Sequence, residues 1–224
     1  MYNQTQKIFA EFIGTAFLLM AIVGSGIMGE TLSGGNTAIA LLANTLAVGA
    51  ILIVLITMLA PVSGAHFNPA VTFGFWLKKM IKTRLALAFI GAQIMGAVLG
   101  VWATHLMFDL DVFQVSTKAR TGHAFLFSEM IATFGLVWVI FVTLKVKPKS
   151  VPMAVGLYII AAYWFAASTS FANPAVTLAR ALTDTFTGIR PIDAPVFMAV
   201  QFIGAAIALY VYKFGLEPRG VNTP

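Results

Sequence analysis

The sequence predicts an all-α membrane protein with six transmembrane helices and two re-entrant half-helices, arranged as an inverted repeat. Three observations support this fold class. Hydrophobic residues make up 59% of the chain and charged residues only 10%, whereas a soluble domain carries about 25% charged residues. Six apolar stretches are long enough, or nearly long enough, to cross a bilayer. The pentapeptide Asn-Pro-Ala-Val-Thr occurs twice, at Asn68 and at Asn173.

The six apolar stretches are the expected spans, because a transmembrane helix needs about 20 predominantly apolar residues. The fifth stretch is short, and the pattern does not define where it ends. The first stretch lacks the charged n-region of a cleavable signal peptide, so we expect it to be a retained helix. The stretches cover residues 8–29, 37–60, 85–108, 124–144, 151–167 and 195–214.

Charged residues sort to two sides of the membrane when the N-terminus is taken as cytoplasmic. Most basic residues then fall in cytoplasmic segments, namely Lys7, Lys78, Lys79, Lys82, Arg84, Lys145, Lys147, Lys149, Lys213 and Arg219. The acidic residues of the loops fall outside, namely Glu30, Asp109, Asp111, Asp184 and Asp193. This distribution follows the positive-inside rule. We therefore expect a multi-pass protein of the inner (plasma) membrane with both termini in the cytoplasm, and we read the net charge of +6 as topology rather than as nucleic-acid binding.

Several function classes are excluded by what the sequence lacks. There is no cysteine, so disulfides and thiolate metal sites are ruled out. No phosphate-binding loop follows a strand, and no nucleophile–base–acid set is present. We therefore expect no enzymatic activity, no cofactor and no metal site.

The two halves of the chain share a pattern. AEFIGTAFL places Glu11 inside the first apolar stretch, and SEMIATFGL places Glu129 in an equivalent setting. GAQIMGAVLG and VQFIGAAIAL place Gln93 and Gln201 in the last span of each half. Each half therefore has three spans, with its Asn-Pro-Ala segment between the second span and the third.

An odd number of spans per half makes the repeat inverted. We expect one transmembrane domain, residues 1–224, with half-repeats at roughly 1–115 and 116–224. The second half enters the membrane from the opposite side, because three spans leave the chain there. Inverted repeats place a substrate site near the bilayer midplane, often between broken helices.

Each Asn-Pro-Ala box predicts the start of a short helix. Asn is a strong N-cap residue, and Pro fits the first helical turn, where its missing N–H leaves no bond unmade. NPAVTFGFWLKK and NPAVTLARALTD each predict about 10 helical residues, roughly 15 Å or half a bilayer. Irregular backbone before them, SGAHF and STSFA, is tolerated only where it is buried or lines water.

Two such half-helices entering from opposite faces can meet at the midplane. Their N-termini each carry about half a positive charge, so cations and protons would be repelled at the junction. Asn68 and Asn173 would both lie there. Their side-chain amides could donate hydrogen bonds to a neutral hydroxylated solute.

These motifs together resemble the aquaporin and aquaglyceroporin family of membrane channels. The resemblance covers essentially the whole chain, through both boxes, the SGAHFNPAVT segment, and the repeated Glu and Gln-x-x-Gly positions. It implies an aquaporin-like right-handed bundle in a lipid bilayer, assembled as a homotetramer with one pore per subunit. It also implies that the pore boxes consist of Asn68, Pro69, Ala70, Asn173, Pro174 and Ala175.

The resemblance further assigns roles to residues near the boxes. Glu11 and Glu129 would each anchor the backbone of a pore loop. Gly64, Ala65 and His66 would present backbone carbonyls to the pore.

One position departs from the family pattern. In most members an Arg directly follows the second box and helps to form the constriction, but here Val176 stands in its place. This removes a fixed charge and five hydrogen-bond donors. Arg180, one helical turn further on, could line the vestibule and partly replace the charge, or it could snorkel to the interface. By spacing from the boxes, Val48 and Ser170 occupy two other filter positions.

The filter position of the fifth span has two candidates. Counting back from Asn173 gives Ala161, whereas counting on from Gly156 gives Tyr163. A Tyr would narrow the pore and add a hydroxyl, and an Ala would leave it open.

Either filter lacks the aromatic–His–Arg set of strict water channels. We therefore expect water and wider neutral solutes: glycerol and other polyols, urea, and metalloid hydroxides such as arsenous, antimonous or boric acid. Val176 after the second box resembles the channels encoded in some bacterial arsenic-resistance operons, which implies arsenicals as solutes.

Two other functions fit the same scaffold. Glu11 or Glu129 could carry protons in a secondary active transporter, because intramembrane acids are usually functional. The missing filter Arg makes an ion channel conceivable. Saturable, proton-coupled flux would indicate the transporter, and current under voltage clamp would indicate the ion channel.

Overall fold

The computed structural model describes residues 2–216, and within them it is helical without strands. Arg219 and the expected cytoplasmic C-terminus lie outside the described residues. The helices are α1 (Gln4–Leu32), α2 (Thr37–Ser63), α3 (Pro69–Leu77), α4 (Thr83–Met107), α5 (His123–Val146), α6 (Val151–Phe165), α7 (Pro174–Arg180) and α8 (Ala194–Val211). A 3₁₀ turn, Pro148–Ser150, precedes α6, and a π-helical segment, Tyr212–Leu216, continues α8.

Five helices are long and apolar enough to cross a membrane: α1, α2, α4, α5, and α8 with its π-helical continuation. The remaining expected span, the fifth along the chain, is α6, which has 15 residues. It is therefore about 22 Å long, short of a hydrocarbon core of about 30 Å. The chain leaves this helix at Phe165 and continues as the irregular segment that leads into α7.

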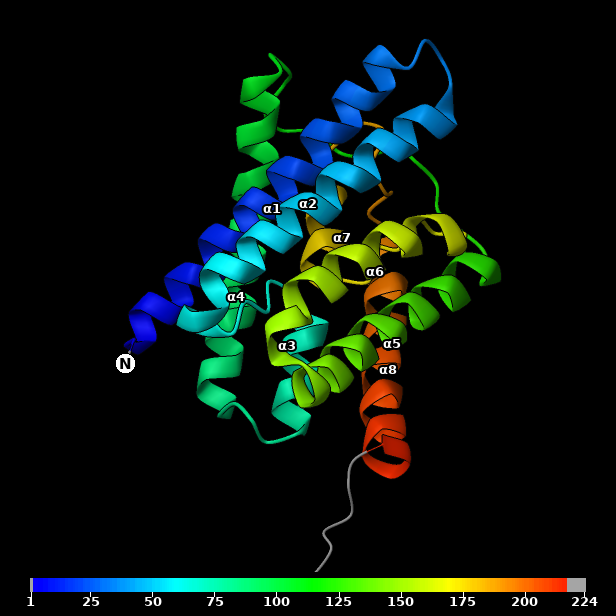
Figure 1. The fold of residues 1–224 in the computed structure, drawn as a ribbon. Coiled ribbons are helices and arrows are strands. Elements are labelled where there is room, and N and C mark those ends of the chain that lie inside the picture. Colours follow the sequence, from blue (N-terminus) through cyan, green and yellow to red (C-terminus); the bar gives the residue numbers. More distant parts are fainter. Residues whose placement is uncertain (1, 217–224) are drawn as a thin grey trace, which may run out of the picture.

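The helices pack as two similar groups. In the first, α1 packs on α2 and α4, and in the second, α5 packs on α6 and α8, while α2 and α6 join the groups (Figure 1). Glycines permit the closest crossings. A Cβ on Gly96 of α4 would collide with the carbonyl oxygen of Phe12, and one on Gly204 of α8 would collide with that of Met130. Small residues let membrane helices approach in this way.

The two half-helices lie in the interior of the bundle (Figure 1). α3 and α7 begin directly after Asn68 and Asn173, where the sequence predicts their starts. α3 has nine residues, close to expectation. α7 has only seven and ends at Arg180, so it is about 10 Å long rather than the expected 15 Å. It stops because the chain turns there, with the carbonyl oxygen of Arg180 accepting from the N–H of Ile189, 3.2 Å away.

Candidate functional site

The two Asn side chains cap α3 and α7 in the same way. Oδ1 of Asn68 accepts from the N–H of Ala70 at 2.8 Å and of Val71 at 3.4 Å. Oδ1 of Asn173 accepts from the N–H of Ala175 at 3.0 Å and of Val176 at 3.3 Å. Each oxygen satisfies N–H groups that the helix leaves unpaired. The amide nitrogens are left to point away from their own helices.

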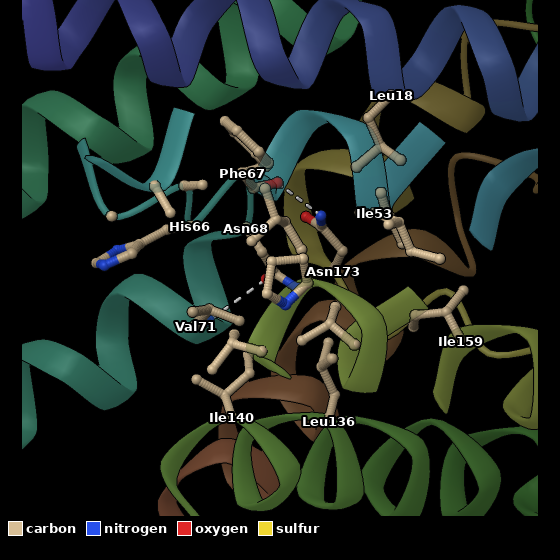
Figure 2. Close-up of a pocket in the computed structure, with 18 of the residues that line it drawn as sticks. Leu18, Ile53, His66, Phe67, Asn68, Val71, Leu136, Ile140, Ile159 and Asn173 are labelled. Carbon is tan, nitrogen blue, oxygen red and sulfur yellow. Dashed lines mark hydrogen bonds between the residues drawn. The ribbon is translucent and has the colours of Figure 1, made fainter. Parts of the chain in front are cut away.

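Those amide nitrogens tie the two half-helices together. Nδ2 of Asn68 donates to the carbonyl oxygen of Ala172 at 2.7 Å, and Nδ2 of Asn173 donates to that of Phe67 at 2.8 Å. Figure 2 shows the second bond and the two Asn side chains beside one another. Because a carboxamide carries two N–H donors, one on each Asn is used in this exchange. The other has no hydrogen-bond partner within the described residues, and both Asn residues line the central cavity.

Glu11 fastens the loop before α3. Its Oε1 accepts from Ser63 Oγ at 2.6 Å and from the N–H of His66 at 2.9 Å. Its Oε2 accepts from the N–H of Phe67 at 2.7 Å and from Nε2 of Gln93 at 2.8 Å. The carboxylate is fully buried, and these four bonds hold the loop in place.

Glu129 fastens the loop before α7 by the same scheme. It accepts from the N–H of Phe171 at 2.8 Å, the N–H of Ala172 at 2.9 Å and Nε2 of Gln201 at 2.7 Å. The same Gln201 nitrogen lies 2.9 Å from the hydroxyl of Thr177. In the first half, Gln93 bridges Glu11 to Thr72 in this way. The sequence shows both Gln residues only as a repeated position. The structure shows why the position repeats: each Gln bridges the loop-anchoring Glu to a Thr of the half-helix.

The loops that these carboxylates hold contain strained backbone. Ala65 and Phe67 have φ values of 52° and 49°, and Ser170 and Ala172 have values of 50° and 46°. A non-glycine residue in the left-handed region costs about 1–3 kcal/mol. The hydrogen bonds to Glu11 and Glu129 offset that cost. The resulting backbone leaves Gly64, Ala65 and His66 on the wall of the central cavity.

The central cavity has a volume of about 630 Å³ and runs past both Asn side chains. Figure 2 shows its mixed wall: Asn68 and Asn173 face apolar side chains from several helices, among them Leu18, Ile53, Leu136, Ile140 and Ile159. Polar groups therefore lie along one part of a cavity wall that is otherwise mostly apolar. Most of the surface that a molecule in this cavity would contact is apolar.

The four expected filter residues all line this cavity: Val48, Tyr163, Ser170 and Val176. Of the two candidates in α6, Tyr163 is buried and reaches the cavity, whereas Ala161 is exposed on the outer surface. Several predicted site residues do not reach it. Within residues 2–216, the cavity wall does not include Glu11, Glu129, Pro69, Ala70, Pro174 or Ala175, which pack behind it.

Arg180 lies at the end of the cavity and does not snorkel to the interface. Its side chain is 2% exposed, its Nε donates to the carbonyl oxygen of Thr187, and its guanidinium carbon lies 3.4 Å from the centroid of the Phe171 ring. The interface alternative is therefore wrong. The cation–π contact and the loop carbonyl bend the side chain inward.

Arg120 is a second buried cation that the sequence analysis missed. It is 7% exposed, and its guanidinium donates to the carbonyl oxygens of Gly188 at 2.8 Å and Ser168 at 3.1 Å. Its guanidinium carbon lies 4.8 Å from the centroid of the same Phe171 ring. Burial lowers the pKa of Arg120 to about 10, so it stays charged at neutral pH. Nothing in the local sequence pattern of the loop between α4 and α5 distinguishes such a residue from an exposed Arg.

The fold and the site define a membrane channel: an inverted-repeat helical bundle in which two half-helices meet tip to tip beside a cavity. Residues 1–170 match the model described as major intrinsic protein, and the chain belongs to that family, whose members are passive channels for water and small solutes, not enzymes.

Relatives and a solved structure agree with this assignment. The chain is 50% identical over 217 residues to Aquaglyceroporin AqpS of Rhizobium meliloti (strain 1021), covering 97% of this chain and 93% of that protein. It is 28% identical over 244 residues to Aquaporin PIP2-1 of Arabidopsis thaliana, covering 96% and 82%. The X-ray structure of the aquaglyceroporin from Plasmodium falciparum superposes with a TM-score of 0.69 at 23% identity, covering 95% and 97%, and supports the fold alone.

Proposed function

We propose that the protein conducts small uncharged solutes wider than water, such as glycerol and other polyols, urea, and metalloid hydroxides including arsenite in its neutral form. The observation that carries this proposal is Val176, an apolar residue on the cavity wall where most family members place an Arg. The 50% identity to a protein named an aquaglyceroporin supports it.

Conduction follows from weak, successive hydrogen bonds. A hydroxylated solute accepts from the free amide hydrogens of Asn68 and Asn173 and donates to backbone carbonyls of Gly64, Ala65 and His66. The apolar side chains opposite the two Asn residues offer the solute no hydrogen bond, so it is held briefly and moves on.

The filter is formed by Val48, Tyr163, Ser170 and Val176. Its two aliphatic side chains supply width and an apolar contact for carbon chains. The hydroxyls of Tyr163 and Ser170 supply a polar edge, and Ser170 Oγ has no hydrogen-bond partner within the described part of the chain. Arg180, one turn beyond Val176, supplies vestibule charge without narrowing the filter itself.

Cations and protons are excluded by fixed positive potential. The N-termini of α3 and α7 converge at the Asn pair, and helix N-termini favour anions over cations. Arg180 adds a full charge at one end of the cavity. This arrangement counts against an ion channel for cations.

The burial of the two glutamates counts against a proton-coupled transporter. Glu11 and Glu129 are fully buried, and the cavity wall within residues 2–216 does not include them. Their oxygens are occupied by loop N–H groups and by Gln93 and Gln201. We therefore assign them to anchoring the pore loops.

We further propose a single channel domain, residues 1–224, built from half-repeats at roughly 1–115 and 116–224. It would lie in the plasma membrane with both termini cytoplasmic, because this orientation places most of the basic residues inside, as the positive-inside rule requires. A homotetramer with one pore per subunit is the expected assembly. The many exposed apolar side chains of α1, α2, α4, α5 and α8 are compatible with lipid and subunit contacts.

Stopped-flow light scattering of proteoliposomes tests the proposal. Under gradients of glycerol, urea or arsenous acid, a channel gives flux that is linear in the gradient, needs no ion gradient and has a low activation energy. Flux that saturates and depends on a proton gradient would overturn it.

A further inference from the structure

A second cavity, of about 350 Å³, adjoins the Arg180 end of the central cavity. Its wall is built from the start of α2, the end of α6 and the loops that flank α5 and α7, and it includes Lys118, Arg120 and Arg180. Arg180 lines both cavities. The volume is roughly ten times the ~30 Å³ that a water molecule occupies in the liquid, which is room for a small, partly hydrated ion.

The three cations of this second cavity lie close together. The guanidinium carbons of Arg120 and Arg180 lie 4.8 Å and 3.4 Å from the centroid of the same Phe171 ring, so their separation cannot exceed the sum of those distances. The ammonium of Lys118 is held against Phe186, 4.7 Å from the ring centroid. Partial burial and the charges of Arg120 and Arg180 lower the pKa of Lys118, although Glu30 and Asp184 act in the opposite direction.

No carboxylate pairs directly with either arginine in the described part of the chain. Within residues 2–216, neither guanidinium has an acidic side chain at ion-pair distance. Asp193 accepts from the backbone N–H of Arg120 and pairs with Arg190 instead. Buried cations are normally paired, because taking a charge out of water is costly.

Arg180 also carries an unpaired donor. Arg180 is 98% buried, and its Nη1 has no hydrogen-bond partner in the described part of the chain. Its Nε is already bound to Thr187, which fixes the plane of the guanidinium. Arg180 therefore lines two cavities and carries a charged N–H group that lacks an acceptor within the described residues.

We propose that this second cavity is a binding site for a phosphate-type oxyanion, held by Arg180 and Arg120 with help from Lys118. The planar fork of Arg matches the geometry of oxyanions, and both guanidiniums contact the Phe171 ring. Because Arg180 also lines the central cavity, a bound oxyanion stands beside the solute path. It blocks neutral solutes at this end and supplies the missing counter-charge.

Only the block of neutral-solute flux rests on the proposed function. Binding of the oxyanion can be measured without any flux. Full-length protein in nanodiscs of neutral lipid is unfolded thermally with increasing inorganic phosphate, with chloride at matched ionic strength as the reference. Phosphate should raise the midpoint by a few degrees, because a ligand that binds only the folded state stabilises it. A midpoint that responds equally to phosphate and chloride would mean that the cations form only an electrostatic barrier, and would overturn the proposal.

The block is measured as glycerol flux into proteoliposomes with phosphate or chloride outside. At ten times its Kd, phosphate should lower the flux about tenfold, because only about one site in eleven remains free. In Arg180→Gln, glycerol flux with phosphate outside should equal glycerol flux with chloride outside, whatever the basal flux of this variant. Lys118→Gln, at an exposed position, should weaken the phosphate effect several-fold, and Lys145→Gln serves as the matched control. An undiminished phosphate effect in both site variants would overturn the site.

The oxyanion could be free phosphate or the phosphate of an anionic lipid headgroup. Nanodiscs that contain phosphatidylglycerol separate these sources. If the headgroup fills the site, phosphatidylglycerol raises the unfolding midpoint of the wild type but not of Arg180→Gln, and it weakens the effect of added phosphate. A phosphatidylglycerol effect of equal size in both proteins would rule out the headgroup at this site.

The site and the proposed function can fail independently. A protein that conducts no neutral solute but is stabilised specifically by phosphate would refute the proposed function and leave this site intact.

Discussion

Replacing the loop-anchoring glutamates by glutamine tests whether they are structural or carry protons. In Glu11→Gln the new amide can face Ser63, whose hydroxyl can turn to accept, but the N–H of His66 is then stranded. In Glu129→Gln the amide strands the N–H of Phe171. In each variant one buried N–H loses its acceptor, and the surviving bonds change from charge-assisted to neutral.

The expected cost follows from that count. A stranded buried N–H costs about 1–3 kcal/mol. For a chain of this size, 1 kcal/mol corresponds to roughly 2–4 °C, so the unfolding midpoint should fall by about 2–12 °C in each variant. Glu30→Gln is the matched control, because Glu30 is exposed at the end of α1 and surface substitutions stay within about 0.5 kcal/mol.

The assay is thermal unfolding in detergent, paired with glycerol flux in proteoliposomes at a temperature well below the midpoint. Anchoring predicts two less stable proteins whose flux needs no proton gradient. If either variant matched Glu30→Gln in stability and lost solute flux while keeping its fold, the anchoring argument would be refuted and a protonation role favoured.

Three further predictions concern the pore and the packing. Val176→Arg should lower glycerol and arsenous acid flux more than water flux in the same proteoliposomes; equal loss of all three with normal insertion would contradict the filter assignment. Asn68→Asp combined with Asn173→Asp removes the donors of both cross-links and adds negative charge, so the cation leak measured under voltage clamp should rise, and an unchanged leak would count against the electropositive junction. Gly96→Ala should destabilise the protein by about 1–3 kcal/mol, because the added methyl group overpacks against α1. Gly91→Ala is the control: Gly91 has open space around it, so this substitution should not lower the unfolding midpoint.

Much of the fold could be read from the chain because its signals are local. Apolar runs predict spans wherever a bilayer is the solvent, and Asn followed by Pro predicts a capped helix start whatever surrounds it. Both half-helices begin where this rule places them. The repeated Glu and Gln positions indicated the internal symmetry before their partners were known.

The details of the candidate site could not be predicted from local sequence. Spacing left Tyr163 and Ala161 equal, and only the packing of α6 on α2 turned Tyr163 to the cavity and Ala161 outward. The length of α7 depended on a turn that closes through Ile189. The burial of Arg120 depended on carbonyls 48 and 68 residues away in the chain.

The sequence by itself determined that this protein is an inverted-repeat helical bundle with two capped half-helices, since hydrophobic length and helix caps act over a few neighbouring residues. The tertiary structure alone decided that each Asn amide bonds the opposite loop and that Tyr163 faces the cavity. It also decided that two arginines gather on Phe171, with no carboxylate among residues 2–216 at ion-pair distance. Those outcomes depend on groups brought together from distant parts of the chain, where packing and the need to satisfy buried polar atoms choose among arrangements that the local sequence allows equally.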